Sequence, residues 1–226
     1  MTLPQESADA TAPPAVTGET ARRLFDASAA ALGLLVLSPV LLVVAVSVAA
    51  SSPGPVFFRQ VRVGKGGRPF NILKFRTMRT DAERTGGQLT VGEDPRITRV
   101  GRFLRQWKLD ELPQLINVVR GDMSLVGPRP EVPRYVELYT EQQRQVLTVR
   151  PGITDPASVA FRSESELMGR HPDPERFYIE EIMPKKLSIN LEYLSRRTLL
   201  SDIGVILNTF RAVSEPESTG SDSQAT

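Results

Sequence analysis

The longest apolar stretch of the chain runs from Ala27 to Ala50 and is broken chiefly by Ser28, Ser38-Pro39 and Ser47. As one continuous helix it would extend about 36 Å, against about 30 Å for the hydrocarbon core of a bilayer. The pattern therefore predicts a membrane segment. A signal peptide is a poor alternative, because the stretch exceeds the usual apolar length and follows some twenty mostly polar residues.

Ser38 and Pro39 lie near the middle of this segment. Proline removes one backbone donor and bends a helix, and the Ser38 hydroxyl can bond a freed carbonyl. Basic residues flank both ends, with Arg22 and Arg23 before the segment and Arg59 after it, whereas a spanning helix usually carries its Lys/Arg excess on one side. A spanning helix stays open, but the residues favour a re-entrant helix over residues 19–52, with both ends on the cytoplasmic face.

Two partly alternating runs follow, at residues 56–63 and 69–78, separated by Gly64-Lys65-Gly66-Gly67. Alternation around a Gly-rich turn predicts a β-hairpin. The turn lacks the spacing of a Walker phosphate loop, so it is interpreted as a hairpin turn.

Helical periodicity returns at residues 97–115 and predicts a core face made of Val100, Phe103, Leu104 and Trp107. Pro113 suits the first turn of a further helix that Gly121 would end. Near the C-terminus, one helical face gathers apolar residues and is interpreted as core or as a helix lying in the membrane interface. These residues are Leu199, Leu200, Ile203, Ile206, Leu207 and Phe210.

The predicted fold class is therefore α+β. A re-entrant helix-break-helix segment at 19–52 would precede a compact cytoplasmic catalytic domain at 53–212, built from a β-hairpin and several helices, some of them interface-lying. Residues 1–18 and the acidic tail 213–226 are too polar to bury much apolar surface and are predicted to be disordered.

Composition narrows the chemistry. The chain has no cysteine and one histidine, His171, in a polar Pro-rich stretch, which argues against disulfides, thiolate metal sites and histidine-based triads. Thirteen Lys/Arg against four acids between residues 59 and 108 give a local net charge of +9. Such a patch needs an anionic partner: lipid headgroups, a pyrophosphate-bearing substrate or, least well supported, nucleic acid.

Two carboxylates stand side by side in KLDELPQL, at Asp110 and Glu111. They are either a reaction centre or an ordinary helix start, with Asp110 as N-cap. Rigid loops at Pro128-Arg129-Pro130 and at Arg150-Pro151 would present arginines at fixed directions, and arginine clamps phosphate groups. Together these features favour the reaction centre.

In this order, the motifs resemble those of the monotopic phosphoglycosyl transferases, the bacterial sugar transferase family. The resemblance covers about residues 21–211, and the length is similar to that of the small members with only the catalytic domain. The motifs are ARRLFD, Ser38-Pro39, SPGPVFFRQVRVG, KFRTM, LDELPQL, GDMSLVGPRPE, RPGIT and DIGVILNTF.

The resemblance implies roles for individual residues. Asp110 would be the covalent nucleophile and would bind Mg²⁺, and Glu111 would be its dyad partner, orienting the metal or a basic residue. Ser38 and Pro39 would break the re-entrant helix. Substrate-binding residues would be Lys74, Arg76, Arg105, Pro128 and Arg129.

The implied reaction transfers a sugar 1-phosphate from a UDP-sugar to polyprenol (undecaprenyl) phosphate and releases UMP. It would occur at the bacterial inner membrane, on the cytoplasmic side, with later glycosyltransferases as further partners and no nucleic acid. Trp107-Lys108 departs from the family pattern, where small polar residues are frequent. The sequence does not identify the sugar, the pathway or the oligomeric state. A membrane-tethered scaffold and a phosphohydrolase remain alternatives.

Overall fold

The computed structural model describes residues 18–80, 82 and 94–214, so the two predicted disordered tails lie almost entirely outside the described residues. Helices α1 (Glu19–Val36) and α2 (Ser38–Ser51) meet at a 65° bend. The Ser38 hydroxyl donates to the Leu35 carbonyl at 2.8 Å, as predicted for a helix break. Within the described ranges no single helix is long and apolar enough to cross a bilayer. Taken together, the two helices of the bent pair have the length and composition of a broken span or a re-entrant loop.

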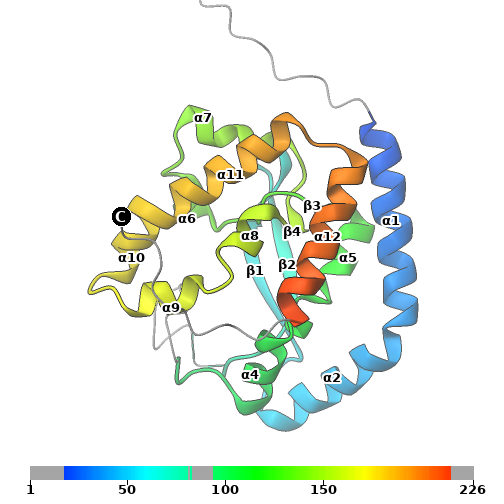
Figure 1. Ribbon diagram of the computed structural model, residues 1–226. Helices are drawn as coiled ribbons and strands as arrows, with labels where there is room; N and C mark the ends of the chain where they lie inside the picture. The colour runs from blue at the N-terminus through cyan, green and yellow to red at the C-terminus, as the bar shows by residue number, and fades with distance from the viewer. Residues whose placement is uncertain (1–17, 81, 83–93, 215–226) are drawn as a thin grey trace, which may run out of the picture.

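Helix α1 packs along α5 (Gln114–Arg120) on one side of the molecule, as Figure 1 shows. Its polar residues attach it there: Arg23 donates to the carbonyls of Val118 and Val119, and buried Asp26 accepts from the Ser124 hydroxyl at 2.5 Å. Apolar side chains on the outer faces of both helices stay exposed. These are Leu24, Phe25, Leu32, Leu35, Val36, Val40, Leu42, Val43 and Val46.

The predicted hairpin is confirmed. Strands β1 (Phe57–Val63) and β2 (Pro69–Phe75) pair antiparallel around the 3₁₀ turn η1 (Lys65–Gly67). A second, parallel pair joins β3 (Ser124–Val126) to β4 (Gly152–Thr154), which the sequence did not predict. Strands this short leave too few residues for alternation to show.

The helix predicted for residues 97–115 is confirmed only in its first part. Helix α4 (Arg99–Gln106) ends before Lys108, whose φ of 53° lies in the left-handed region, and the 3₁₀ helix η2 (Leu109–Glu111) follows. Helix α5 then ends at Gly121, at φ 94°, as predicted. Leu104 is buried, but Phe103 and Trp107 are 55% and 45% exposed, so the prediction that both belong to the core is wrong.

Further helices complete the described chain and, together with the two small sheets, confirm the α+β class (Figure 1). The largest core cluster includes Tyr135, Tyr178, Ile182 and Leu187. The elements are α6 (Pro133–Val136), α7 (Glu141–Arg144), η3 (Gln145–Thr148), α8 (Pro156–Ala160), α9 (Glu164–Gly169), α10 (Pro174–Phe177), the π-helical η4 (Tyr178–Ile182), α11 (Met183–Ser195) and α12 (Leu199–Ser214).

Helix α12 extends two residues past the predicted boundary at 212. Much of its predicted apolar face is exposed, including Leu200, Leu207 and Phe210, so that face is not core. Its buried Asp202 instead receives hydrogen bonds from Arg22 of α1 and from Arg197, both at 2.8 Å. This network ties the two ends of the described chain together.

Candidate active site

Asp110 and Glu111 occupy the 3₁₀ helix η2, in the corner between α4 and α5 and against strand β2. The left-handed Lys108 turns the chain into this corner. Both carboxylates are buried, at 7% and 9% exposure. Their burial is unusual for adjacent acidic residues, which normally stay solvated unless paired.

Glu111 is paired with two basic side chains from distant parts of the sequence. It accepts from Lys74 Nζ at 2.8 Å and from one Arg129 guanidinium nitrogen at 2.5 Å, with the other at 3.3 Å. Burial opposes its charged form, but the charges of Arg129 and Lys74 outweigh burial and hold the pKa of Glu111 well below its usual range. Glu111 therefore carries a negative charge that fixes both cations.

Asp110 is in a different state. Its Oδ1 is buried and has no hydrogen-bond partner within the described part of the chain. Burial raises the pKa of Asp110, and the neighbouring charge of Glu111 raises it further, against the lowering effect of Lys74 and Arg105. Helix α5 begins after Pro113 without a side-chain cap, so Asp110 is not its N-cap. Among the described residues, Asp110 thus has a buried carboxylate oxygen without a hydrogen-bond partner, close to the positive charges of Lys74 and Arg105.

Arg105 reaches the same corner from α4. Its Nε donates to the Thr77 hydroxyl at 2.8 Å; burial lowers its pKa, and the negative charge of Asp110 opposes that shift. The backbone of α4 lies directly against the residues that follow β2, since a Cβ at Gly101 would lie only 2.0 Å from the Thr77 carbonyl oxygen. This close contact fixes the position of Arg105. The structure thus brings Arg105 near Asp110.

Arg76 lies elsewhere. Its buried guanidinium donates to the carbonyls of Ser52, at 2.5 Å, and Val48, at 3.3 Å, at the C-terminal end of α2. Its contacts there are those of a helix cap, which favours cations. Of the predicted basic residues, Lys74, Arg105 and Arg129 therefore surround the acidic pair, whereas Arg76 connects the end of β2 to the C-terminal end of α2.

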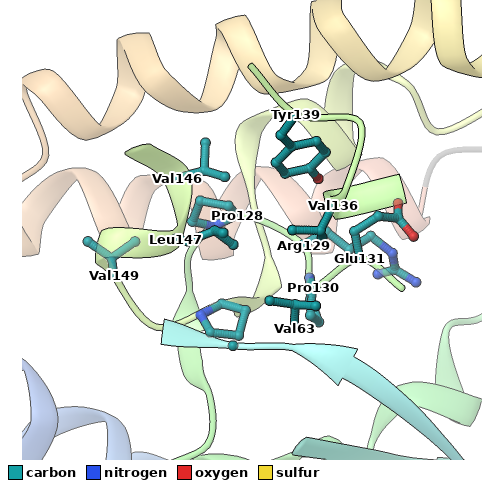
Figure 2. Close-up of a pocket in the computed structure, with 12 residues that line it drawn as sticks. Val63, Pro128, Arg129, Pro130, Glu131, Val136, Tyr139, Val146, Leu147 and Val149 are labelled. Carbon is teal, nitrogen blue, oxygen red and sulfur yellow. The ribbon is translucent and has the colours of Figure 1, made fainter. Parts of the chain in front are cut away.

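The loop Pro128-Arg129-Pro130 forms one wall of a small pocket, shown in Figure 2. Glu131 supports this loop, since it accepts from Arg62 at 3.1 Å and from the Tyr178 hydroxyl at 2.5 Å. Pro128 is buried in the loop and shapes the backbone that carries Arg129. Sequence reasoning did not select Glu131, because nothing in the pattern shows that it meets residues far along the chain.

Sequence reasoning also missed Gln114, one turn beyond the pair. It is 1% exposed, and both ends of its amide lack hydrogen-bond partners within the described residues. A buried amide without partners is rare in folded proteins. Its place inside the LDELPQL motif was the one available signal.

Whether the site could hold a metal ion depends on Oδ1 of Asp110. Within the described residues no three His, Asp or Glu side chains gather into a metal cage. Mg²⁺ is commonly held by one or two carboxylates together with substrate phosphates and water. Oδ1 of Asp110, which has no hydrogen-bond partner among those residues, fits that kind of site, whereas Glu111 is already paired with two cations.

Comparison with known proteins shows the family of this chain. The sequence model described as bacterial sugar transferase matches residues 17–216. The chain belongs to this family. The resemblance stated from the motifs is thereby confirmed.

Among its relatives is the UDP-glucose:undecaprenyl-phosphate glucose-1-phosphate transferase of Caulobacter vibrioides, 38% identical over 87% of this chain and 70% of the relative. The Escherichia coli enzyme of the same name is 40% identical over 83% of this chain but only 39% of its own length. A UDP-N-acetylgalactosamine-undecaprenyl-phosphate N-acetylgalactosaminephosphotransferase of Aeromonas hydrophila is 37% identical over 85% of this chain and 43% of the relative. The names differ in sugar, so they do not identify the sugar for this chain.

Proposed function

We propose that this chain transfers a sugar 1-phosphate from a UDP-sugar to undecaprenyl phosphate and releases UMP, as the first membrane step in making a glycoconjugate. The observation that carries the proposal is the buried Asp110 oxygen that lacks a hydrogen-bond partner among the described residues and lies near the positive charges of Lys74 and Arg105. The names of the relatives support both classes of substrate.

The proposed reaction has two steps. A carboxylate oxygen of Asp110 bonds to the sugar-proximal phosphorus, the bond from that phosphorus to the bridging oxygen breaks, and UMP leaves with the electron pair. A phosphate oxygen of undecaprenyl phosphate then attacks the same phosphorus. The bond to Asp110 breaks, which restores the carboxylate and yields undecaprenyl diphosphosugar. Such a covalent route gives ping-pong kinetics.

The residues around Asp110 suit this chemistry. A carboxylate that approaches a diphosphate meets like charge, and fixed cations must compensate for it. Lys74 and Arg129 are held in place by Glu111, so their positions are set before substrate binds. Burial and the charge of Glu111 raise the pKa of Asp110, so its carboxylate is less well stabilised by its surroundings than that of an exposed aspartate.

Mg²⁺ is part of the proposal. Asp110 would hold it through Oδ1, which has no hydrogen-bond partner in the described part of the chain, and when bound the ion would neutralise charge on the donor's diphosphate. Glu111 would act by orienting Lys74 and Arg129.

The helix pair α1–α2 is proposed to enter the bilayer and return, with the bend at Leu37 deepest and the catalytic domain on the cytoplasmic face of the inner membrane. The 65° bend and the exposed apolar residues of both helices support this placement. The acceptor's phosphate lies at the membrane surface, so an active site fixed at that height limits the search to a plane.

The proposed function is tested by incubating the purified full chain with Mg²⁺ and a panel of UDP-sugars, with and without undecaprenyl phosphate. We expect continuous UMP release and a lipid-linked sugar only when the acceptor is present. Continuous UMP release without acceptor and without lipid product would indicate a phosphohydrolase. No UMP with any sugar would favour a non-catalytic membrane scaffold.

A further inference from the structure

Two large aromatic side chains face outward beside the candidate active site, one on α4 and the other on the residue that caps its C-terminal end. Phe103 is 55% and Trp107 45% exposed, and their ring centroids lie 6.5 Å apart in a tilted arrangement. We call these two residues the aromatic ledge. Exposed large apolar side chains that gather in one place commonly mark a binding surface.

The ledge is close to the nucleophile. Trp107 precedes Asp110 by three residues, so their Cα atoms are separated by no more than about 11 Å. From α4, Arg105 turns toward Thr77 and Asp110. Helix α4 therefore directs the Arg105 cation toward the site, while the rings of Phe103 and of the capping residue Trp107 face solvent.

Helix α4 also lies against the membrane segment. Leu104, on its buried face, packs in one cluster with Val44 and Val48 of α2, and the two helices lie side by side in Figure 1. The exposed apolar face of α2 and the ledge thus belong to adjoining elements. Arg99, Arg102 and Lys108 are exposed around the ledge and give it a positive surround.

We propose that the aromatic ledge binds the first isoprene units of the polyprenyl phosphate acceptor. This inference rests on the proposed function. The acceptor's apolar chain begins at its phosphate oxygen, so a phosphate that reaches the phosphosugar on Asp110 must place its first isoprene units within a few ångströms of the site. Aromatic faces bury such units well, and the neighbouring basic residues complement the phosphate.

The test compares Trp107→Ala with the parent chain in detergent micelles, where no bilayer contributes. We expect the KM for undecaprenyl phosphate to rise roughly tenfold, the factor for losing one well-buried aromatic contact. UMP released per enzyme from donor alone should keep the parent's amplitude. Phe103→Ala should act in the same direction, Trp107→Phe should recover most of the affinity, and Leu138→Ala, at a comparably exposed apolar residue, should change nothing.

An unchanged acceptor KM in Trp107→Ala would overturn the inference. A rise seen in vesicles but not in micelles would also overturn it, because the ledge would then hold the protein on the bilayer without binding the acceptor chain. If the parent chain itself releases no UMP from donor, the proposed function fails and the result is distinct from both.

Discussion

Replacing Asp110 by Asn is expected to abolish sugar-phosphate transfer, with a loss of at least about 10³-fold in kcat. An amide oxygen cannot take the place of the ionised carboxylate that attacks phosphorus. Steady-state UMP release with undecaprenyl phosphate and the preferred UDP-sugar measures the loss. Activity within tenfold of the parent would remove Asp110 from the mechanism.

The same substitution is expected to keep or raise the free energy of unfolding at neutral pH. Because burial and Glu111 raise the pKa of folded Asp110, the folded state holds this proton more tightly than the unfolded chain does. Asp110 therefore contributes less stability as the pH rises from about 3.9 through the raised pKa. Asn has no proton to lose, so the free energy of unfolding of Asp110→Asn should exceed that of the parent above this pH range but not below it. Denaturant unfolding on both sides of the range measures the difference.

A surface substitution that removes one negative charge provides the control. Glu137 is exposed, and Glu137→Gln should change neither activity nor unfolding by a measurable amount. If Asp110→Asn and Glu137→Gln behaved alike in both measurements, the special state of Asp110 would be contradicted.

Glu111→Gln is expected to have the opposite effect on stability, lowering the free energy of unfolding by about 3 kcal/mol at pH 7. The substitution leaves Lys74 and Arg129 beside an uncharged partner. Both cations then lose their fixed positions, so activity should fall as well. Urea unfolding at several pH values is the measurement.

The direction of the pKa shift decides how the stability difference between the parent and Glu111→Gln changes with pH. The pKa of Glu111 is depressed in the folded chain, chiefly because the charges of Arg129 and Lys74 overcome the effect of burial. Its contribution is complete above the unfolded pKa of about 4.3 and is lost as the pH falls through the depressed folded value. The difference between parent and Glu111→Gln should therefore shrink in acid. A difference that is constant with pH would mean that Glu111 acts by packing alone.

Local chemistry allowed parts of the fold to be predicted. A Ser-Pro step inside an apolar run and a Gly-rich turn between alternating runs each specify a structure within a few residues. Both the helix break at Leu37 and the β1–β2 hairpin are present. Amphipathicity misled at Phe103 and Trp107, because it shows that a helix has an apolar face but not what covers that face.

The contacts of the candidate site were much less accessible to sequence reasoning. Glu111 and Lys74 are 37 residues apart, and Glu111 and Arg129 are 18 apart. No local pattern specifies such pairs, since they depend on how β2 packs against η2. The motif led to Asp110 and Glu111, but only the packing shows that Glu111 pairs with two cations and that one oxygen of Asp110 has no hydrogen-bond partner within the described residues.

Mass spectrometry of the full chain mixed with Mg²⁺ and UDP-sugar alone tests the covalent intermediate most directly. The mechanism predicts a mass increase of one sugar phosphate, located by peptide mapping on Asp110 and discharged when undecaprenyl phosphate is added. An adduct on another residue, or no adduct while the chain still converts donor and acceptor to product, would contradict it.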